Sequence, residues 1–231
     1  MVVAALSGFV AGLVHVLSGP DHLAAVAPLA VDSERHPWQA GLLWGFGHTG
    51  GVLVVGLLAL LLRELLPIEA LSWWGERLVG VVLIGIGVWG IRRATGLRVH
   101  AHEHTHDEVR HVHLHAHAGS APHDRAAHTG TTHRHGHAHT HAAFAVGVLH
   151  GLAGSSHLLG VLPALAFPTR GASVAYLGAF GIASVAAMAL FAGAVGLIAT
   201  RARAGNAAIY RIALYASSSA AIIVGVAWLI M

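Results

Sequence analysis

The chain has 231 residues, of which 55% are hydrophobic and only 10% charged, with a formal net charge of +3. Soluble domains carry roughly 25% charged residues, so this composition predicts a membrane protein. The thirteen basic residues are all arginines and form no patch with aromatic residues, which argues against nucleic acid as a partner. The absence of cysteine excludes disulfides and thiolate metal sites.

Six apolar segments are each long enough for the ~20 residues that a membrane-spanning helix needs. They cover about residues 2–31, 38–62, 73–92, 142–167, 171–200 and 207–231. The predicted fold class is therefore an all-α polytopic membrane protein with six transmembrane helices.

The first apolar stretch of each half carries the same pattern. Residues 9–28 and 144–163 are identical at nine of twenty positions, including two histidines and the glycine between them. Because each half holds an odd number of spans, the second half must enter the membrane in the opposite sense, which predicts inverted three-helix repeats. The expected domains are the repeats at 1–98 and 142–231, joined by a loop at 99–141.

Helices 1 and 4 are expected to be broken at the centre of this duplicated pattern. Residues 2–31 would reach about 45 Å as one straight helix, against a hydrocarbon core of ~30 Å. Gly19 and Pro20 supply an interruption, since proline removes a backbone donor and glycine relaxes the dihedral angles. The fourth segment has only a glycine and two serines at residues 154–156, so its break is inferred from the repeat.

The loop at residues 99–141 holds fifteen of the 21 histidines, mostly in His-x-His order. Small and polar residues fill the gaps, so we expect a disordered loop with no packed core. Dense imidazoles bind divalent metal ions. The loop is therefore expected to capture or buffer metal ions.

Three candidate metal-ligating residues surround the predicted break: His15, Asp21 and His22. Ionisable groups at membrane depth are costly and usually functional. On an intact helix the two histidines would lie ~10 Å apart along the axis, too far to hold one ion, whereas a break lets them converge. Asp21 would then be either an anionic ligand or the partner that orients an imidazole.

Three further histidines are candidates for the same metal site. His150 and His157 are the repeat equivalents of His15 and His22. We expect them to supply one ligand or to line the route of the metal ion. His48 lies among glycines that permit close helix approach, so it can reach the first helix.

The distribution of arginines between the connections predicts the orientation of the chain in the membrane. Nine arginines fall in the first, third and fifth connections and three on the opposite side. This places the His-rich loop in the cytoplasm and both termini outside. The expected location is the cell inner (plasma) membrane, with the lipid bilayer as a partner.

Two motifs carry a family resemblance: HVLSGPDH at residues 15–22 and GFGHT at residues 45–49. They resemble signatures of the nickel/cobalt permease superfamily, the NiCoT and NicO groups, most closely its urease-accessory-like branch. The spacer between His15 and Asp21 is one residue longer than the family's usual one. The resemblance implies metal recognition by His15, Asp21, His22 and His48.

The sequence thus predicts a transporter of divalent Ni²⁺ or Co²⁺, with Zn²⁺ also compatible with these ligands, and not an enzyme. No resident cofactor is expected. Without an ATP-binding motif, energy would come from ion coupling, a downhill gradient or an additional transporter subunit, and a cytosolic metallochaperone is a further candidate partner. The alternatives are a zinc permease, an intramembrane metal-dependent enzyme and a bis-histidine haem protein.

Overall fold

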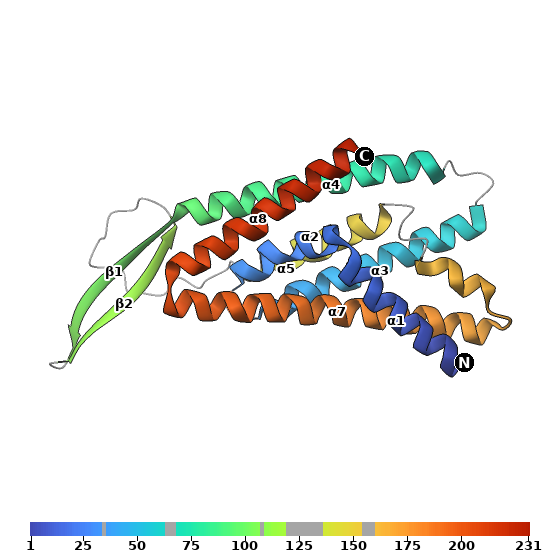
Figure 1. Ribbon diagram of the computed structural model, residues 1–231, viewed down its shortest axis with the longest axis horizontal. Helices are drawn as coiled ribbons and strands as arrows, with labels where there is room; N and C mark the ends of the chain where they lie inside the picture. The colour runs from blue at the N-terminus through green and yellow to red at the C-terminus, as the bar shows by residue number, and fades with distance from the viewer. Residues whose placement is uncertain (34–35, 63–67, 107–108, 119–135, 154–159) are drawn as a thin grey trace.

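The computed structural model describes residues 1–33, 36–62, 68–106, 109–118, 136–153 and 160–231. Its helices form one elongated bundle with a two-stranded hairpin at one end, and both termini lie away from that hairpin (Figure 1). The elements in chain order are α1 (Val2–Ser18), α2 (Pro20–Asp32), α3 (Pro37–Leu62), α4 (Ile68–Gly96), β1 (Leu97–His106), β2 (Val109–Ala118), α5 (Gly136–Leu152), the 3-10 helix η1 (Leu162–Ala166), α7 (Arg170–Gly205) and α8 (Ala207–Ile230).

The first span is broken as predicted. Helix α1 ends at Ser18, α2 begins at Pro20, and the two axes differ by 70°. Gly19 between them has an extended backbone, with φ −86° and ψ 102°. Proline is well suited to the first position of α2, because its fixed φ is helical and its missing N–H would have no partner there.

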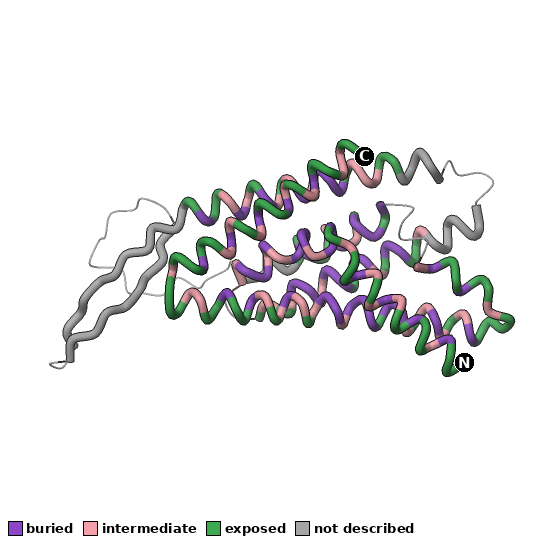
Figure 2. Tube along the Cα trace, viewed as in Figure 1, coloured by how far each residue is buried: buried purple, intermediate pink, exposed green. Residues whose placement is uncertain are grey.

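Among the described residues, three helices are long and apolar enough to cross a membrane: α4 over Trp73–Thr95, α7 and α8. The bent pair α1–α2 passes the same test as one interrupted span. Buried and exposed positions alternate along these helices (Figure 2). These features identify a helical membrane protein, while the full count of six spans stays a prediction.

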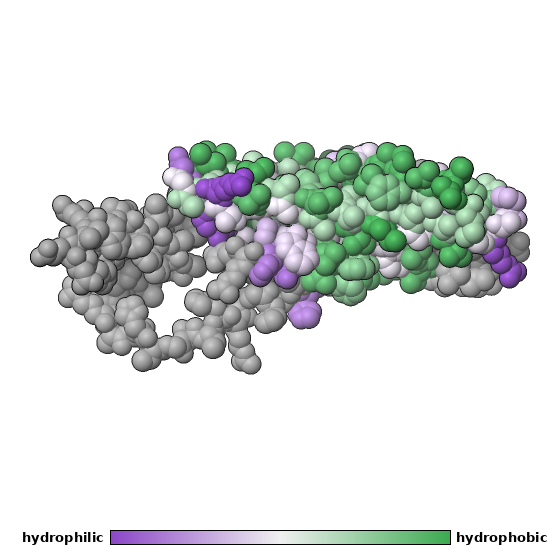
Figure 3. Space-filling model, turned by 90° about the horizontal axis from the view of Figure 1, so that it is seen from below, coloured by the Kyte–Doolittle hydropathy of each residue, from purple (hydrophilic) through white to green (hydrophobic). Residues whose placement is uncertain are grey.

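Hydrophobic residues dominate the face of the bundle that Figure 3 shows, and many large apolar side chains of the described residues are exposed. Residues that are more than half exposed include Leu6, Val14, Val174, Ile182, Ile212 and Ile223. An outer surface of this kind is suited to lipid, because apolar patches of this extent are rare on soluble monomers. The interior holds many alanines, large apolar side chains such as Trp44, Phe180 and Met188, and a few polar residues.

The structure differs from the expected disordered loop at both ends of residues 99–141. Strands β1 and β2 form an antiparallel hairpin whose register pairs His100 with His115 and His104 with His111. The His-x-His alternation has the two-residue period of a strand, which the compositional argument overlooked. At the other end α5 already begins at Gly136.

The fourth apolar segment, predicted at 142–167, also has different bounds. Helix α5 ends at Leu152, and η1 covers Leu162–Ala166. The predicted break at residues 154–156 lies outside the described residues, and so does His157.

Two helix pairs make equivalent backbone contacts. Helix α1 packs against α7, where a Cβ atom on Gly12 would collide with the carbonyl oxygen of Phe180. Helix α5 packs against α3, where a Cβ atom on Gly147 would collide with the carbonyl oxygen of Trp44. Gly12 and Gly147 are equivalent positions of the sequence repeat, so both halves use the same glycine to bring two backbones together.

Helices α4 and α8 cross at a reciprocal pair of glycines. A Cβ atom on Gly80 would lie 2.7 Å from the carbonyl oxygen of Gly225, and one on Gly225 would lie 2.6 Å from that of Gly80. This contact is therefore the same when it is read from either helix.

A polar cluster fixes the end of α2 that lies farthest from the break. The carboxylate of Asp32 accepts hydrogen bonds from Arg93 of α4 at 3.1 Å and from the Tyr210 hydroxyl of α8 at 3.2 Å. Arg203 of α7 donates to the carbonyl oxygens of Val31 and Asp32, both at 3.4 Å. The Arg203 guanidinium also lies 4.1 Å from the centre of the Tyr210 ring. Three helices therefore hold α2 at this end.

We predict that Gly147→Ala lowers the free energy of unfolding by about 1–3 kcal/mol, because the added methyl group forces α3 and α5 apart. The matched control is Gly85→Ala on α4, where an added Cβ would meet no atom within 4 Å. That control should be neutral or slightly stabilising, since alanine is the better helix former. Unfolding of the two variants in mixed micelles, followed by circular dichroism, measures the difference, and equal stabilities would contradict the proposed contact.

Candidate metal centre

Four histidines and one aspartate meet in the middle of the bundle, brought together by α1, α2, α3 and α5. Asp21, His22, His48 and His150 are each at most 3% exposed, and His15 is partly exposed. All five were expected at the site from the sequence. The sixth candidate, His157, lies outside the described residues.

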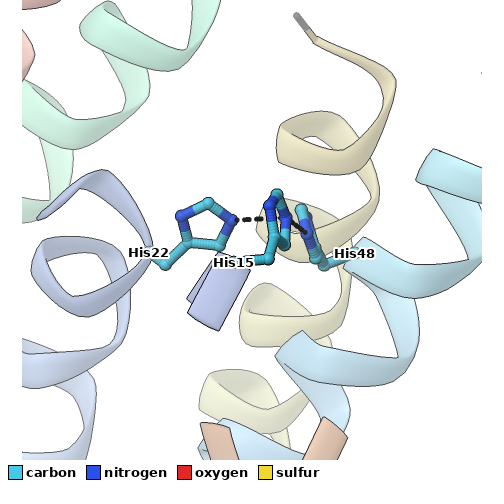
Figure 4. A group of neighbouring side chains, drawn as sticks. All are labelled: His15, His22 and His48. Atoms are coloured by element: carbon cyan, nitrogen blue, oxygen red, sulfur yellow. Dashed lines mark hydrogen bonds between the residues drawn. The ribbon is translucent and has the colours of Figure 1, made fainter. Parts of the chain in front are cut away.

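The histidines of α1, α2 and α3 point the same ring nitrogen towards one another (Figure 4). The Nε2 atom of His15 lies 3.2 Å from Nε2 of His48 and 3.3 Å from Nε2 of His22. Nitrogen ligands bonded to one ion at ~2.0–2.1 Å in tetrahedral geometry lie roughly 3.3 Å apart. Both of these distances are thus close to those between ligands of a single ion, and ligand nitrogens of all three histidines lie within 4.8 Å of one another.

Hydrogen bonding alone satisfies this arrangement poorly. A ring nitrogen of a neutral imidazole carries either one hydrogen or one lone pair. Nε2 of His15 can therefore make only one well-formed hydrogen bond with its two Nε2 neighbours. A cation that accepts all three lone pairs would satisfy the three nitrogens together.

Asp21 lies behind this trio and contacts two imidazoles. Its Oδ1 atom is 2.9 Å from Nδ1 of His22, and its Oδ2 atom is 3.0 Å from Nε2 of His150. A carboxylate only accepts hydrogen bonds, so the contact with His22 places the ring hydrogen on Nδ1 and leaves the Nε2 lone pair facing His15. Of the two roles expected for Asp21, this geometry favours the partner that orients a ligand.

Trp44 was not singled out in the sequence, although it contacts several of the site's imidazoles. Its ring stacks on His48 at a centroid distance of 4.8 Å and lies 5.2 Å from His150 and 5.6 Å from His22. Trp44 precedes His48 by four residues, which places both on one face of α3. That spacing was the available signal, but an aromatic residue in an apolar helix usually indicates core packing.

A cavity of about 480 Å³ lies beside His15, Asp21 and His22. Its walls come from α1, α2, α7, α8 and the segment around η1, and include Ser18, Gly160, Pro163, Tyr176 and Trp228. His15 lines this cavity together with Asp21 and His22, and it is the partly exposed member of the trio.

Neither a protein-family profile nor a solved structure matches the chain. It is similar to two curated proteins of Arabidopsis thaliana, the chloroplast proteins FOR GROWTH AND FERTILITY 1 and 2. The identities are 37% over 193 residues and 38% over 185 residues, which cover 83% and 80% of this chain. The chain spans about half the length of these relatives, 49% and 44% respectively.

A shorter match links the chain to the urease accessory protein UreH of Bacillus sp. (strain TB-90). The two are 34% identical over 87 residues, which cover 35% of this chain and 36% of that protein. The comparisons thus relate this helical membrane protein to chloroplast proteins over most of its length, and to a urease accessory protein over about a third of it.

Proposed function

We propose that this protein moves divalent nickel or cobalt across a membrane through the site formed by His15, Asp21, His22, His48 and His150. The observation that supports this most is the convergence of three Nε2 atoms at ligand spacing beside a buried carboxylate. Four buried or half-buried imidazoles around one anion have no role in holding an ordinary apolar core. Ionisable groups at membrane depth are energetically costly, and where they occur they usually serve a function.

The chemistry of the ligands restricts the cargo. Imidazole nitrogen suits Ni²⁺, Co²⁺, Zn²⁺ and Cu²⁺, whereas hard ions such as Mg²⁺ and Ca²⁺ prefer oxygen. His15, His22 and His48 would hold the ion, with Asp21 offsetting part of its charge through His22. The match to a urease accessory protein agrees with the resemblance to the urease-accessory-like branch of the nickel/cobalt permease superfamily, which favours nickel or cobalt among these ions.

The packing of the helices supports a pair of inverted repeats. If the halves are related by a two-fold axis in the membrane plane, the contact of α1 with α7 becomes the contact of α5 with α3, as the equivalent glycines suggest. The pair α4–α8 would be its own equivalent, in agreement with the reciprocal glycine contact. On this basis we propose six spans, with the ion site beside the break of the first span.

We propose that the protein lies in the cell inner (plasma) membrane with its termini outside and the His-rich segment in the cytoplasm. The arginine distribution supports this orientation. Because the hairpin lies at the opposite end of the bundle from both termini, the segment can collect ions at one end of the path (Figure 1). Movement of the ion would be driven by an ion gradient or by a partner subunit.

The proposal predicts that His22→Ala abolishes uptake of ⁶³Ni²⁺ into proteoliposomes, because the variant loses the nitrogen that links the trio to Asp21. A second variant, lacking residues 99–135, should keep transport and change its dependence on nickel concentration. His36→Ala, which lies in a connection between helices, serves as the matched control. Equal flux in the wild type and in His22→Ala would show that this site does not take part in transport.

Asp21→Asn should lower Co²⁺ affinity by about 10–100-fold, the range typical of residues that orient metal-bound histidines. The amide has a similar shape, but it can donate a hydrogen to Nδ1 of His22 and so favours the wrong tautomer. Visible absorption of Co²⁺ titrated into the purified protein measures the affinity, with Glu76→Gln as the control. An unchanged affinity in Asp21→Asn would show that the carboxylate does not orient a ligand.

The His-rich segment should release its metal as the pH falls below about 6.5, the ordinary pKa of histidine, because a protonated imidazole cannot bind a metal ion. Calorimetric titration with Ni²⁺ at pH 7.5 and pH 5.5 tests this, with the variant lacking residues 99–135 as the reference. The difference in bound nickel between the two proteins should be large at pH 7.5 and small at pH 5.5. A difference that persists at pH 5.5 would contradict binding by neutral histidines.

A further inference from the structure

Trp44 lies against three imidazoles of the site and is completely buried, with 0% of its surface exposed. Its plane is nearly parallel to that of His48, at an angle of 16°. It lies at 51° to the ring of His150 and at 67° to that of His22. One indole therefore contacts histidines from α2, α3 and α5.

The backbone on both sides of these contacts is tightly packed. Gly147 presses against the carbonyl oxygen of Trp44, and Gly151, one turn later, presses against that of His48. His150 lies on the same segment of α5. Because α3 and α5 approach this closely, the distance between Trp44 and the imidazoles is set by the backbones and cannot relax easily.

Tryptophan is a costly choice if the only requirement is to fill space. The Nε1 atom of Trp44 is buried and has no hydrogen-bond partner among the described residues. A buried donor without an acceptor is destabilising, whereas phenylalanine would bring an aromatic ring without that polar atom. The presence of an indole here calls for an advantage other than packing.

The charge of a bound ion supplies that advantage. A divalent ion held by neutral imidazoles withdraws electrons from their rings, so each ring becomes more positive. His22 and His150 have the carboxylate of Asp21 nearby to offset this charge. His48 has the face of Trp44 at 4.8 Å, and an indole face is the most favourable aromatic partner for a positive group.

We infer that Trp44 is a positioning residue of the ion site: it holds the ring of His48 and stabilises the positive charge that a bound ion places on it. The inference rests on the proposed metal-binding function and adds a residue that acts through His48. It assigns α3 two functional positions, Trp44 and His48, one turn apart.

Titration of the detergent-solubilised full-length protein with Co²⁺ tests the inference, using Trp44→Phe, Trp44→Leu and, as the matched control, the exposed Trp74→Phe. The component of the cobalt absorption that is missing in His22→Ala reports the site. Trp44→Leu should weaken Co²⁺ binding by about tenfold, and Trp44→Phe by no more than about threefold, since phenylalanine keeps an aromatic face. Trp44→Phe should melt no lower than Trp44→Leu, and Trp74→Phe should bind as the wild type does.

Tryptophan fluorescence gives a second readout, which tests whether Co²⁺ binds next to Trp44. Co²⁺ bound to the trio should quench Trp44 by contact, so the quenched fraction should fall in Trp44→Phe and in His22→Ala but not in Trp74→Phe. Wild-type affinity in Trp44→Leu, or equal losses in Trp44→Phe and Trp44→Leu, would overturn the inference, because packing and not the ring face would then explain Trp44. If the wild type and His22→Ala bind Co²⁺ identically, the proposed metal site itself fails.

Discussion

The break between Ser18 and Pro20 is the constraint on which the rest of the site depends. In a continuous helix, His15 and His22 would lie ~10 Å apart along the axis. The 70° bend brings their Nε2 atoms to within 3.3 Å of each other. It also places Asp21 in the first turn of α2, so a single interruption turns a distant pair of histidines into a compact group with its own anion.

Burial strengthens the electrostatic interactions between Asp21 and the histidines. Asp21 is 3% exposed, and in a low-dielectric interior its charge acts on neighbouring imidazoles with little screening by water. The same burial makes an uncompensated ion costly there, so ligand, anion and aromatic face have to act together. Two contacts would stabilise the positive charge of a bound ion. Trp44 stacks on His48, and Asp21 contacts His22 and His150.

Local chemistry made part of this predictable. The break at Pro20 follows from the proline ring and the missing N–H, which need no knowledge of the fold. The meeting of His48 and His150 with the first span depends on how α3 and α5 pack, and a single sequence contains that only indirectly, as glycines. The hairpin was not predicted because the histidine-rich composition was weighed and the two-residue alternation of the histidines, which is the period of a strand, was not. Trp44 was missed because its spacing from His48 has no chemical meaning until the rings are seen to stack.

The polar cluster at the far end of α2 determines how that half-helix can move. Its thirteen residues are joined to α1 through Gly19 alone, while Asp32 is clamped by Arg93 and Tyr210. A rotation of α2 about Gly19 would require the hydrogen bonds of Asp32 with Arg93 and Tyr210 to break. Any rotation of α2 that moved His22 away from His15 would thus have to break contacts of Asp32, at the other end of the same helix.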